Sequence, residues 1–136
     1  IFVLSGQVKF GGKTPISVGA DLMANTEDPT ISGFEDQKTG YVAQASIGQL
    51  KNTKDWLLGF YYANIERFSV IENFAQDDWW RFGSGHTNSS DLKGFEIRAA
   101  LQIGKNTNLV ARHYVTEMIV GNNEANRFRI DLNTKF

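Results

Sequence analysis

The chain has 136 residues and a formal net charge of -1, so it carries neither a basic field for nucleic acid nor a strongly acidic surface. Cysteine is absent, which excludes a disulfide framework, a thiol nucleophile and a cysteine-ligated metal site. Mean hydropathy is -0.32, and no stretch approaches the ~20 consecutive apolar residues of a membrane helix, a criterion that does not detect membrane barrels.

The first two predicted strands are joined by a tight turn. Apolar side chains at alternate positions over 2–10 are typical of a strand with one apolar face. Glycine and proline at 11–15 indicate a turn, and the alternation resumes over 16–25. Both strands carry charge on the opposite face, at Lys9 and at Asp21. The opening residues of the chain lack the basic region of a signal peptide, so we expect a mature or truncated start.

The next two predicted strands differ in pattern. Residues 26–39 are polar and are predicted to form a loop, after which a strand is expected over 40–48. A short turn at 51–55 leads to a fourth strand over 56–63. This strand is apolar on both faces, so alternation alone does not orient it.

The last part of the chain shows the clearest period of two. In chain order we expect a long segment at 68–91, a strand at 95–103, a turn at 104–108, a strand at 109–116, a turn at 121–126 and a strand at 127–136. His113 lies on the apolar side of the sixth strand. Because no segment shows a helical period, we predict an all-β chain of seven antiparallel strands.

Aromatic spacing favours a membrane barrel over a soluble one. Phe2 and Phe10 are eight residues apart, as are Phe128 and Phe136, and eight residues of strand span ~26 Å. A tilted strand of that length approaches the ~25 Å apolar band that aromatic girdles flank. Membrane-interface aromatics are therefore expected at Phe2, Phe10, Tyr41, Trp56, Phe95, Phe128 and Phe136.

Alternation of short and long connections also favours a membrane barrel, whose periplasmic turns are short and whose external loops are longer. With the C-terminus on the periplasmic side, the turns at 11–15, 51–55 and 104–108 all fall on that side. Residues 1–136 are thus predicted to be a single segment of an up-and-down transmembrane β-barrel. Seven strands leave an unpaired edge, which is costly in lipid, so we expect a fragment of a larger barrel. The alternative is an eighth strand within 68–91 that closes a small barrel.

The last residues resemble the terminal strand of outer-membrane barrels. Such strands end in an aromatic residue and have apolar residues at alternate positions before it, as this chain has at Phe128, Ile130, Leu132 and Phe136. The resemblance implies that these four residues are the signal read by the barrel-assembly machinery. Thr134 departs from the pattern because it is polar on the lipid face.

Residues 56–136 further resemble the C-terminal portion of the "putative porin" family of proteobacteria. The resemblance is carried by 56–66, by 94–97 after a polar loop, and by 105–109. It implies a porin in the outer membrane of a Gram-negative bacterium, acting as a monomer or a homotrimer for passive diffusion of small hydrophilic solutes and ions. The expected partners are the lipid bilayer, lipopolysaccharide and the assembly machinery, without nucleic acid or a cofactor.

Charged residues opposite the apolar face are the expected lining of the pore. They are Lys9, Asp21, Glu96, Arg98, Arg112, Arg129 and Asp131, with Arg127 and Lys135 beside them. Basic residues outnumber acidic ones, so one hypothesis is a wall that mildly favours anions. The alternative is that opposite charges pair across strands and only hydrate the lumen.

The 68–91 segment allows several interpretations. It could fold inward as a constriction, contact a ligand or protein through Trp79 and Trp80, or pack its aromatics on the barrel rim, which we favour. Glu72, Asp77 and Asp78 could attract calcium, but their spacing matches no standard loop.

We expect no enzyme. Ser84, His86 and Asp78 supply catalytic residue types from one loop only, and Glu117 lies ~13 Å along the strand from His113. Two other functions stay open: a non-conducting barrel that scaffolds or houses a partner, and a soluble β-barrel that binds a lipophilic ligand.

Overall fold

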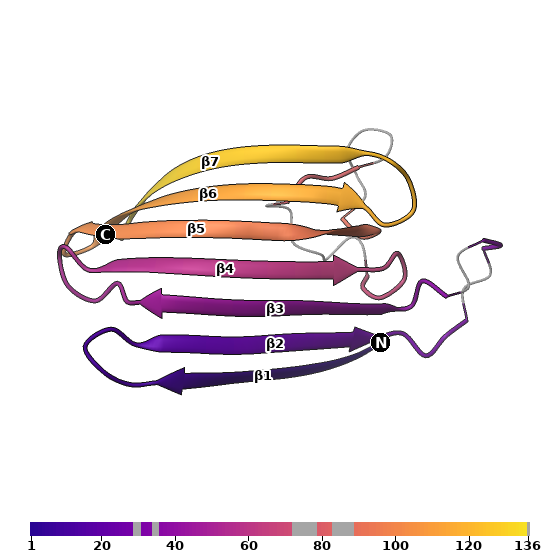
Figure 1. Ribbon diagram of the computed structural model, residues 1–136, viewed down its shortest axis with the longest axis horizontal. Coiled ribbons are helices and arrows are strands. Elements are labelled where there is room, and N and C mark those ends of the chain that lie inside the picture. The colour runs from indigo at the N-terminus through magenta and orange to yellow at the C-terminus, as the bar shows by residue number, and fades with distance from the viewer. Residues whose placement is uncertain (29–30, 34–35, 72–78, 83–88, 136) are drawn as a thin grey trace.

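The computed structural model describes residues 1–28, 31–33, 36–71, 79–82 and 89–135, whose strands form a single antiparallel β-sheet (Figure 1). The strands are β1 (Phe2–Phe10), β2 (Ile16–Ala24), β3 (Thr39–Gly48), β4 (Trp56–Ile65), β5 (Leu92–Gly104), β6 (Thr107–Met118) and β7 (Glu124–Thr134). Each strand pairs with its neighbours in chain order, which confirms the predicted all-β chain of seven antiparallel strands. Among the described residues, no helix is long and apolar enough to cross a bilayer.

The two long connections, at 25–38 and 66–91, leave the end of the sheet opposite to the turns at 11–15, 49–55 and 105–106, and the short connection at 119–123 leaves the same end as the long ones. The end with the three turns is the one where β7 finishes, on the left of Figure 1, as the sequence predicted. In the turn before β4, the backbone N–H groups of Lys51 and Asn52 donate to a carboxylate oxygen of Asp55 at 3.0 and 2.8 Å.

Two strands, β5 and β7, begin three residues earlier than their sequence pattern indicated. β5 starts at Leu92, which is buried and pairs with Ile65 on one side and Met118 on the other. The predicted turn at 121–126 is shorter in the structure, because β7 already begins at Glu124. Burial of the first β5 residues, rather than local propensity, extends the sheet at this end.

Gly94 marks a close approach between β5 and β6. A Cβ atom at this position would collide with the carbonyl oxygen of Val115 and lie 2.9 Å from the Cα of Thr116. The backbone of Gly94 also has a φ of 157°, which residues with side chains rarely adopt. Glycine is therefore required here by the fold.

Cross-strand register sorts the side chains into two faces, because directly paired residues point to the same side of a sheet. We call one the apolar face, with Leu4, Val18, Phe60, Ile97 and Ile130 among its residues. We call the other the polar face, and it carries Gln7, Gln44, Glu96, Arg112 and Arg129 among others. The register also orients β4, whose Phe60 belongs to the apolar face and Tyr61 to the polar one.

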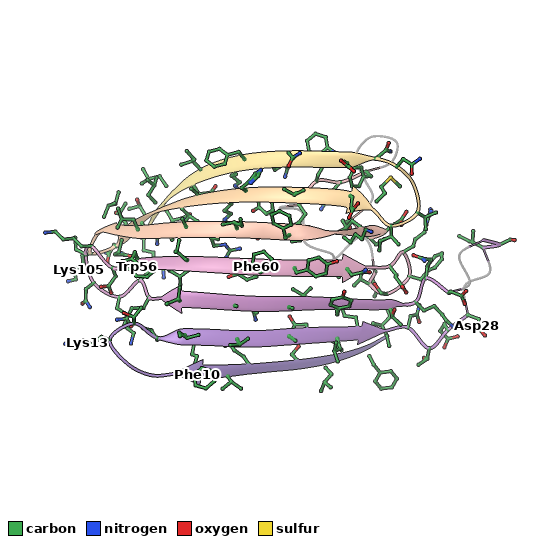
Figure 2. All side chains as sticks on the ribbon, in the orientation of Figure 1. Phe10, Lys13, Asp28, Trp56, Phe60 and Lys105 are labelled. Atoms are coloured by element: carbon green, nitrogen blue, oxygen red, sulfur yellow. The ribbon has the colours of Figure 1, made fainter. Side chains whose placement is uncertain are left out.

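Burial is inverted relative to a sheet that covers an ordinary soluble core. On the apolar face Leu4 is 69% and Leu132 66% exposed, and large apolar side chains stand out all along the sheet (Figure 2). On the polar face Glu96 is 3% and Thr116 0% exposed. An exposed apolar surface of this extent marks a site of contact with a membrane or with further protein.

The buried core lies on the polar face, near the end with the long connections. Trp79 and Phe82, which belong to the 66–91 connection, are buried there. They pack with residues from three strands, namely Ala63, Ile65, Leu92 and Tyr114. We call residues 79–82 the strap, because this segment lies across the polar face.

Candidate functional site on the polar face

All the charged residues expected to line a pore lie on the polar face. They are Lys9 on β1, Asp21 on β2, Glu96 and Arg98 on β5, Arg112 on β6, and Arg129 and Asp131 on β7. Lys9 and Asp21 are separated from the others by β3 and β4. The structure therefore gathers five of the seven on neighbouring strands and leaves two apart.

Three arginines form a row across the sheet. Arg98 pairs directly with Arg112, and Arg112 pairs directly with Arg129. Like charges directly opposite each other destabilise a sheet, and neighbouring strands lie only about 5 Å apart. The row therefore depends on nearby carboxylates for its stability.

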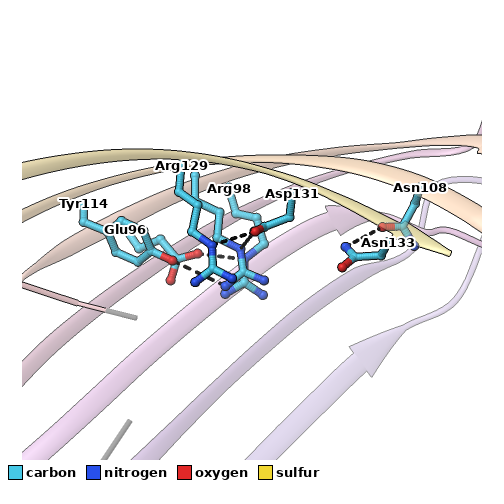
Figure 3. A network of polar contacts seen from close by, with 8 residues as sticks. Glu96, Arg98, Asn108, Tyr114, Arg129, Asp131 and Asn133 are labelled. Atoms are coloured by element: carbon cyan, nitrogen blue, oxygen red, sulfur yellow. Dashed lines mark hydrogen bonds and ion pairs between the residues drawn. The ribbon is translucent and has the colours of Figure 1, made fainter. Parts of the chain in front are cut away.

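Glu96 and Asp131 supply those carboxylates, one from each flanking row (Figure 3). Arg98 Nε donates to Glu96 Oε1 at 2.7 Å, and Arg129 Nε donates to Asp131 Oδ1 at 2.6 Å. Arg112 Nε forms a longer ion pair, 3.5 Å, with Asp131 Oδ2. The predicted pairing of opposite charges is thus present, both along a strand and across strands.

Aromatic residues also contact the arginines, and Tyr61 and Tyr114 stand in the same cross-strand row as Glu96. The guanidinium of Arg98 lies 4.5 Å from the ring centre of Tyr61, and Arg112 Nη1 donates to the hydroxyl of Tyr114 at 3.3 Å. Arg127, next to the row on β7, lies 5.6 Å from the ring centre of Trp80. Cation–π contacts of this kind restrict where a guanidinium can move.

Among the described residues, the cluster contains four arginines, three in the row and Arg127 beside it, and two carboxylates, Glu96 and Asp131. Arg112, Arg127 and Arg129 also have further interaction partners. Each guanidinium has five N–H donors, so it can bind more than one acceptor.

A cavity of about 380 Å³ adjoins the row between the sheet and the connection that carries the strap. Its polar lining is Tyr61, Ser89, Glu96 and Arg98. The rest of the wall is apolar and consists of Met23, Val42, Ala63, Ile65, Val70, Trp79 and Leu92. The cavity thus joins an apolar wall to the first arginine of the row.

The expected membrane-interface aromatics that the structure describes all lie on the apolar face. Phe10 and Trp56 are near the end with the short turns, whereas Phe2, Tyr41 and Phe95 are near the opposite end. Phe128 lies further along β7, where it pairs with His113. His113 itself is on the apolar face, as its position in the sequence indicated. Phe136 lies outside the described residues.

The residues expected to form the assembly signal follow one face of the edge strand β7. Phe128, Ile130 and Leu132 are 65%, 61% and 66% exposed on the apolar face. Thr134 continues that face and its hydroxyl lies 3.4 Å from the hydroxyl of Thr107 on β6. An exposed apolar stripe on an edge strand is suited to pairing with another strand.

The carboxylates considered for calcium, Glu72, Asp77 and Asp78, lie outside the described residues, as do Ser84 and His86. Among the described residues no cluster of three or more His, Asp or Glu side chains could hold a metal ion.

Sequence reasoning missed the aromatic partners of the cluster. Tyr61 was hidden in a strand that is apolar on both faces, and Tyr114 was assigned only to the side opposite the apolar face. For Tyr114 the available signal was its position two residues from Arg112, on the same face of the strand, whereas β4 has no charged residue to mark the face of Tyr61.

Comparison with known protein families gives one match. A family whose description is "Putative porin" matches residues 16–136, which include β2 to β7. Comparisons with curated proteins and with solved structures give no match.

Proposed function

The chain belongs to the "Putative porin" family, and from this premise we propose that its strands form part of the wall of an outer-membrane channel. In this proposal the channel passes small hydrophilic solutes and ions by passive diffusion. The apolar face contacts lipid and lipopolysaccharide, and the polar face lines a water-filled lumen. The chain has no catalytic role.

Inverted burial is the observation that carries this proposal. A soluble barrel places its apolar side chains inside, whereas a membrane barrel places them outside and keeps polar ones in the lumen. Here the large apolar residues are exposed on one face and charged residues such as Glu96 are covered on the other. This distribution argues against the alternative of a soluble barrel with a lipophilic ligand.

Strand length supports a membrane-spanning sheet. The strands contain between 9 and 13 residues, and a transmembrane β-strand needs about 9–11 when tilted. β1 and β7 are the two edges of the sheet. An open edge is costly in lipid, so the proposal requires that further strands pair with both edges and close the barrel.

The connections give the proposed barrel a direction. Short turns belong to the periplasmic side and longer loops to the outside. The strap then covers the polar face near the external mouth, where it narrows the lumen. This position supports the inward-folding interpretation of the 68–91 segment over packing on the rim alone.

Single-channel recording tests the proposal. The full-length protein would be reconstituted into planar bilayers with a salt gradient across them. Stepwise ohmic openings are the expected result, because a polar wall with mobile ions conducts in proportion to voltage. Silence from protein that is folded in the bilayer would overturn it and favour a barrel whose lumen is occupied or houses a partner.

A further inference from the structure

A groove on the polar face lies over the first four strands, whereas the arginine row lies on β5 to β7. It is formed by β1 to β4 together with the turns at 11–15 and 49–55, at the lower left of Figure 1. Its volume of about 540 Å³ falls within the range of small-molecule sites, about 300–1,000 Å³. The uncharged polar side chains in its lining are Gln7, Ser17, Gln44, Ser46 and Gln49.

We propose that this groove binds neutral polyhydroxylated solutes, for which a disaccharide is the test case. The inference rests on the proposed channel function, for which it names a preferred class of solute. The hydroxyl groups of the solute exchange hydrogen bonds with the amides and serines, and its C–H groups contact Leu57 and Tyr61, which also line the groove.

Ser17 gives the groove a buried hydroxyl that can take a hydrogen bond. The residue is 9% exposed, and its Oγ atom has no hydrogen-bond partner among the described residues. Its direct neighbours across the sheet, Lys9 and Ser46, line the same groove. A buried hydroxyl without a partner is unfavourable, so a solute hydroxyl that bonds to it stabilises the complex.

Amides and hydroxyls match a sugar better than they match an ion. Each glutamine side chain has two N–H donors and a carbonyl acceptor, and a serine hydroxyl both donates and accepts. Sugar hydroxyls also donate and accept, so two neighbouring hydroxyls can use both ends of one amide. An inorganic anion only accepts hydrogen bonds, and it would leave the acceptors of Gln7 and Gln44 unused.

Two glycines keep the floor of the groove open. Gln44 lies over Gly19, because its amide nitrogen would be 2.9 Å from a Cβ atom added there. Tyr61 lies over Gly59, where one of its ring carbons would be 3.0 Å from an added Cβ atom. Both side chains can therefore lie along the sheet, which leaves the space above it to a solute.

Lys9 and Lys51 also line the groove and are the reason to consider an anion instead. Both residues are exposed. An exposed ammonium group is strongly hydrated and is screened by salt, so it contributes little to a fixed anion site. The buried polar side chain in the lining is the neutral one of Ser17, which favours a neutral solute.

Saturation-transfer NMR on the full-length protein tests the site without requiring conductance. The protein would be held in micelles of a detergent that has no sugar headgroup, and sucrose and tetraethylene glycol would be titrated. We expect sucrose to bind at least about tenfold more tightly, because its hydroxyls donate and accept whereas ether oxygens only accept. Sodium sulfate at constant ionic strength should not displace sucrose.

Variants identify the residues responsible. Ser17→Ala should weaken sucrose binding about three- to tenfold, the scale of one neutral hydrogen bond. Because this hydroxyl has no partner among the described residues, the urea midpoint of Ser17→Ala should not fall. Ser5→Ala is the matched control, since it removes an exposed hydroxyl from the same face outside the groove and should leave the affinity unchanged.

Gln44→Leu is the second variant, because it keeps a side chain of similar size and removes the amide. It should weaken sucrose binding about tenfold, since the amide can form more than one hydrogen bond with the solute. Unchanged affinity in both Ser17→Ala and Gln44→Leu would show that sucrose binds elsewhere and would overturn the inference.

The other outcomes separate this inference from the proposed function. Openings in bilayers without sucrose binding would leave the channel standing and overturn the site. Sucrose binding without openings would support the site in a barrel that does not conduct. Equal affinity for sucrose and tetraethylene glycol, or displacement of sucrose by sulfate, would overturn the inference even if the channel conducts.

Discussion

The rings of Trp79 and Tyr114 meet edge to face, with their centres 6.2 Å apart and their planes at 63°. Tyr114 is a fully buried residue of β6, and Trp79 belongs to the strap. Edge-to-face pairs add to the effect of buried area, so this contact fastens a connecting segment onto the polar face. The width of the proposed channel near its mouth thus depends on two aromatic rings.

Trp79→Ala is expected to release the strap. Truncating a buried tryptophan costs about 3–5 kcal/mol in a packed core, and here the loss falls mainly on the strap and its contacts. The unitary conductance in planar bilayers should therefore rise. Trp56→Ala, which removes an exposed tryptophan from the apolar face, should leave the unitary conductance of inserted channels unchanged. An unchanged conductance in Trp79→Ala would show that the strap does not limit ion flow.

Gly94→Ala is expected to destabilise the sheet. The new methyl group would collide with the β6 backbone at Val115, and overpacking with backbone strain costs about 1–3 kcal/mol. The midpoint of urea unfolding in lipid vesicles measures the loss. Gly6→Ala is the control, because nothing lies within 4 Å of the Cβ it would add. Equal midpoints for the two variants would contradict the close approach of β5 and β6.

A charge added to the apolar face should prevent stable insertion. Ile97 lies in the middle of β5 and is 48% exposed on the apolar face, so Ile97→Lys would place a cation in lipid. The expected cost is about 2–4 kcal/mol at the bilayer midplane. Gln44→Lys adds the same charge to the polar face of β3 and should be tolerated. The folded fraction in vesicles measures both, and equal tolerance would argue against lipid on the apolar face.

Asp55 should make the turn before β4 sensitive to acid. The backbone N–H groups of Asn52 and Lys51 hold the pKa of this carboxyl below its usual value of 3.8. A lowered pKa gives stability that is present above pH 3.8 and is lost as the pH falls through the folded-state value. Urea midpoints measured below pH 5 should therefore fall less steeply for Asp55→Asn than for the unaltered protein. Identical slopes would remove Asp55 from the acid response.

The strands and their faces could be predicted because alternation is a local property of the sequence. β1 and β2 match the predicted ranges closely, since their apolar residues recur strictly at every second position. Glycine and proline at 11–15 marked the first turn for the same reason. Only β4, apolar on both faces, needed its neighbours to orient it.

The site could not be predicted because it depends on register and on contacts distant in sequence. The charges of Arg98 and Arg129 were evident, but their shared row with Arg112 follows only from two strand pairings. Likewise, no local pattern indicates that Trp79 packs on Tyr114, 35 positions away. Leu92, where β5 begins, was left out of the predicted strand, because its burial depends on pairing with Ile65 and Met118.

The separation of short turns from long connections means that the two ends of the sheet tolerate change differently. At one end, β5 and β6 are joined by only residues 105–106, so an insertion there would disturb strand pairing directly. At the other end, the 25–38 connection can lengthen with little effect on the pairing of β2 with β3. We therefore expect sequence divergence to accumulate, and inserted epitope tags to be tolerated, only at the end with the long connections. The turns at the opposite end are expected to keep their lengths.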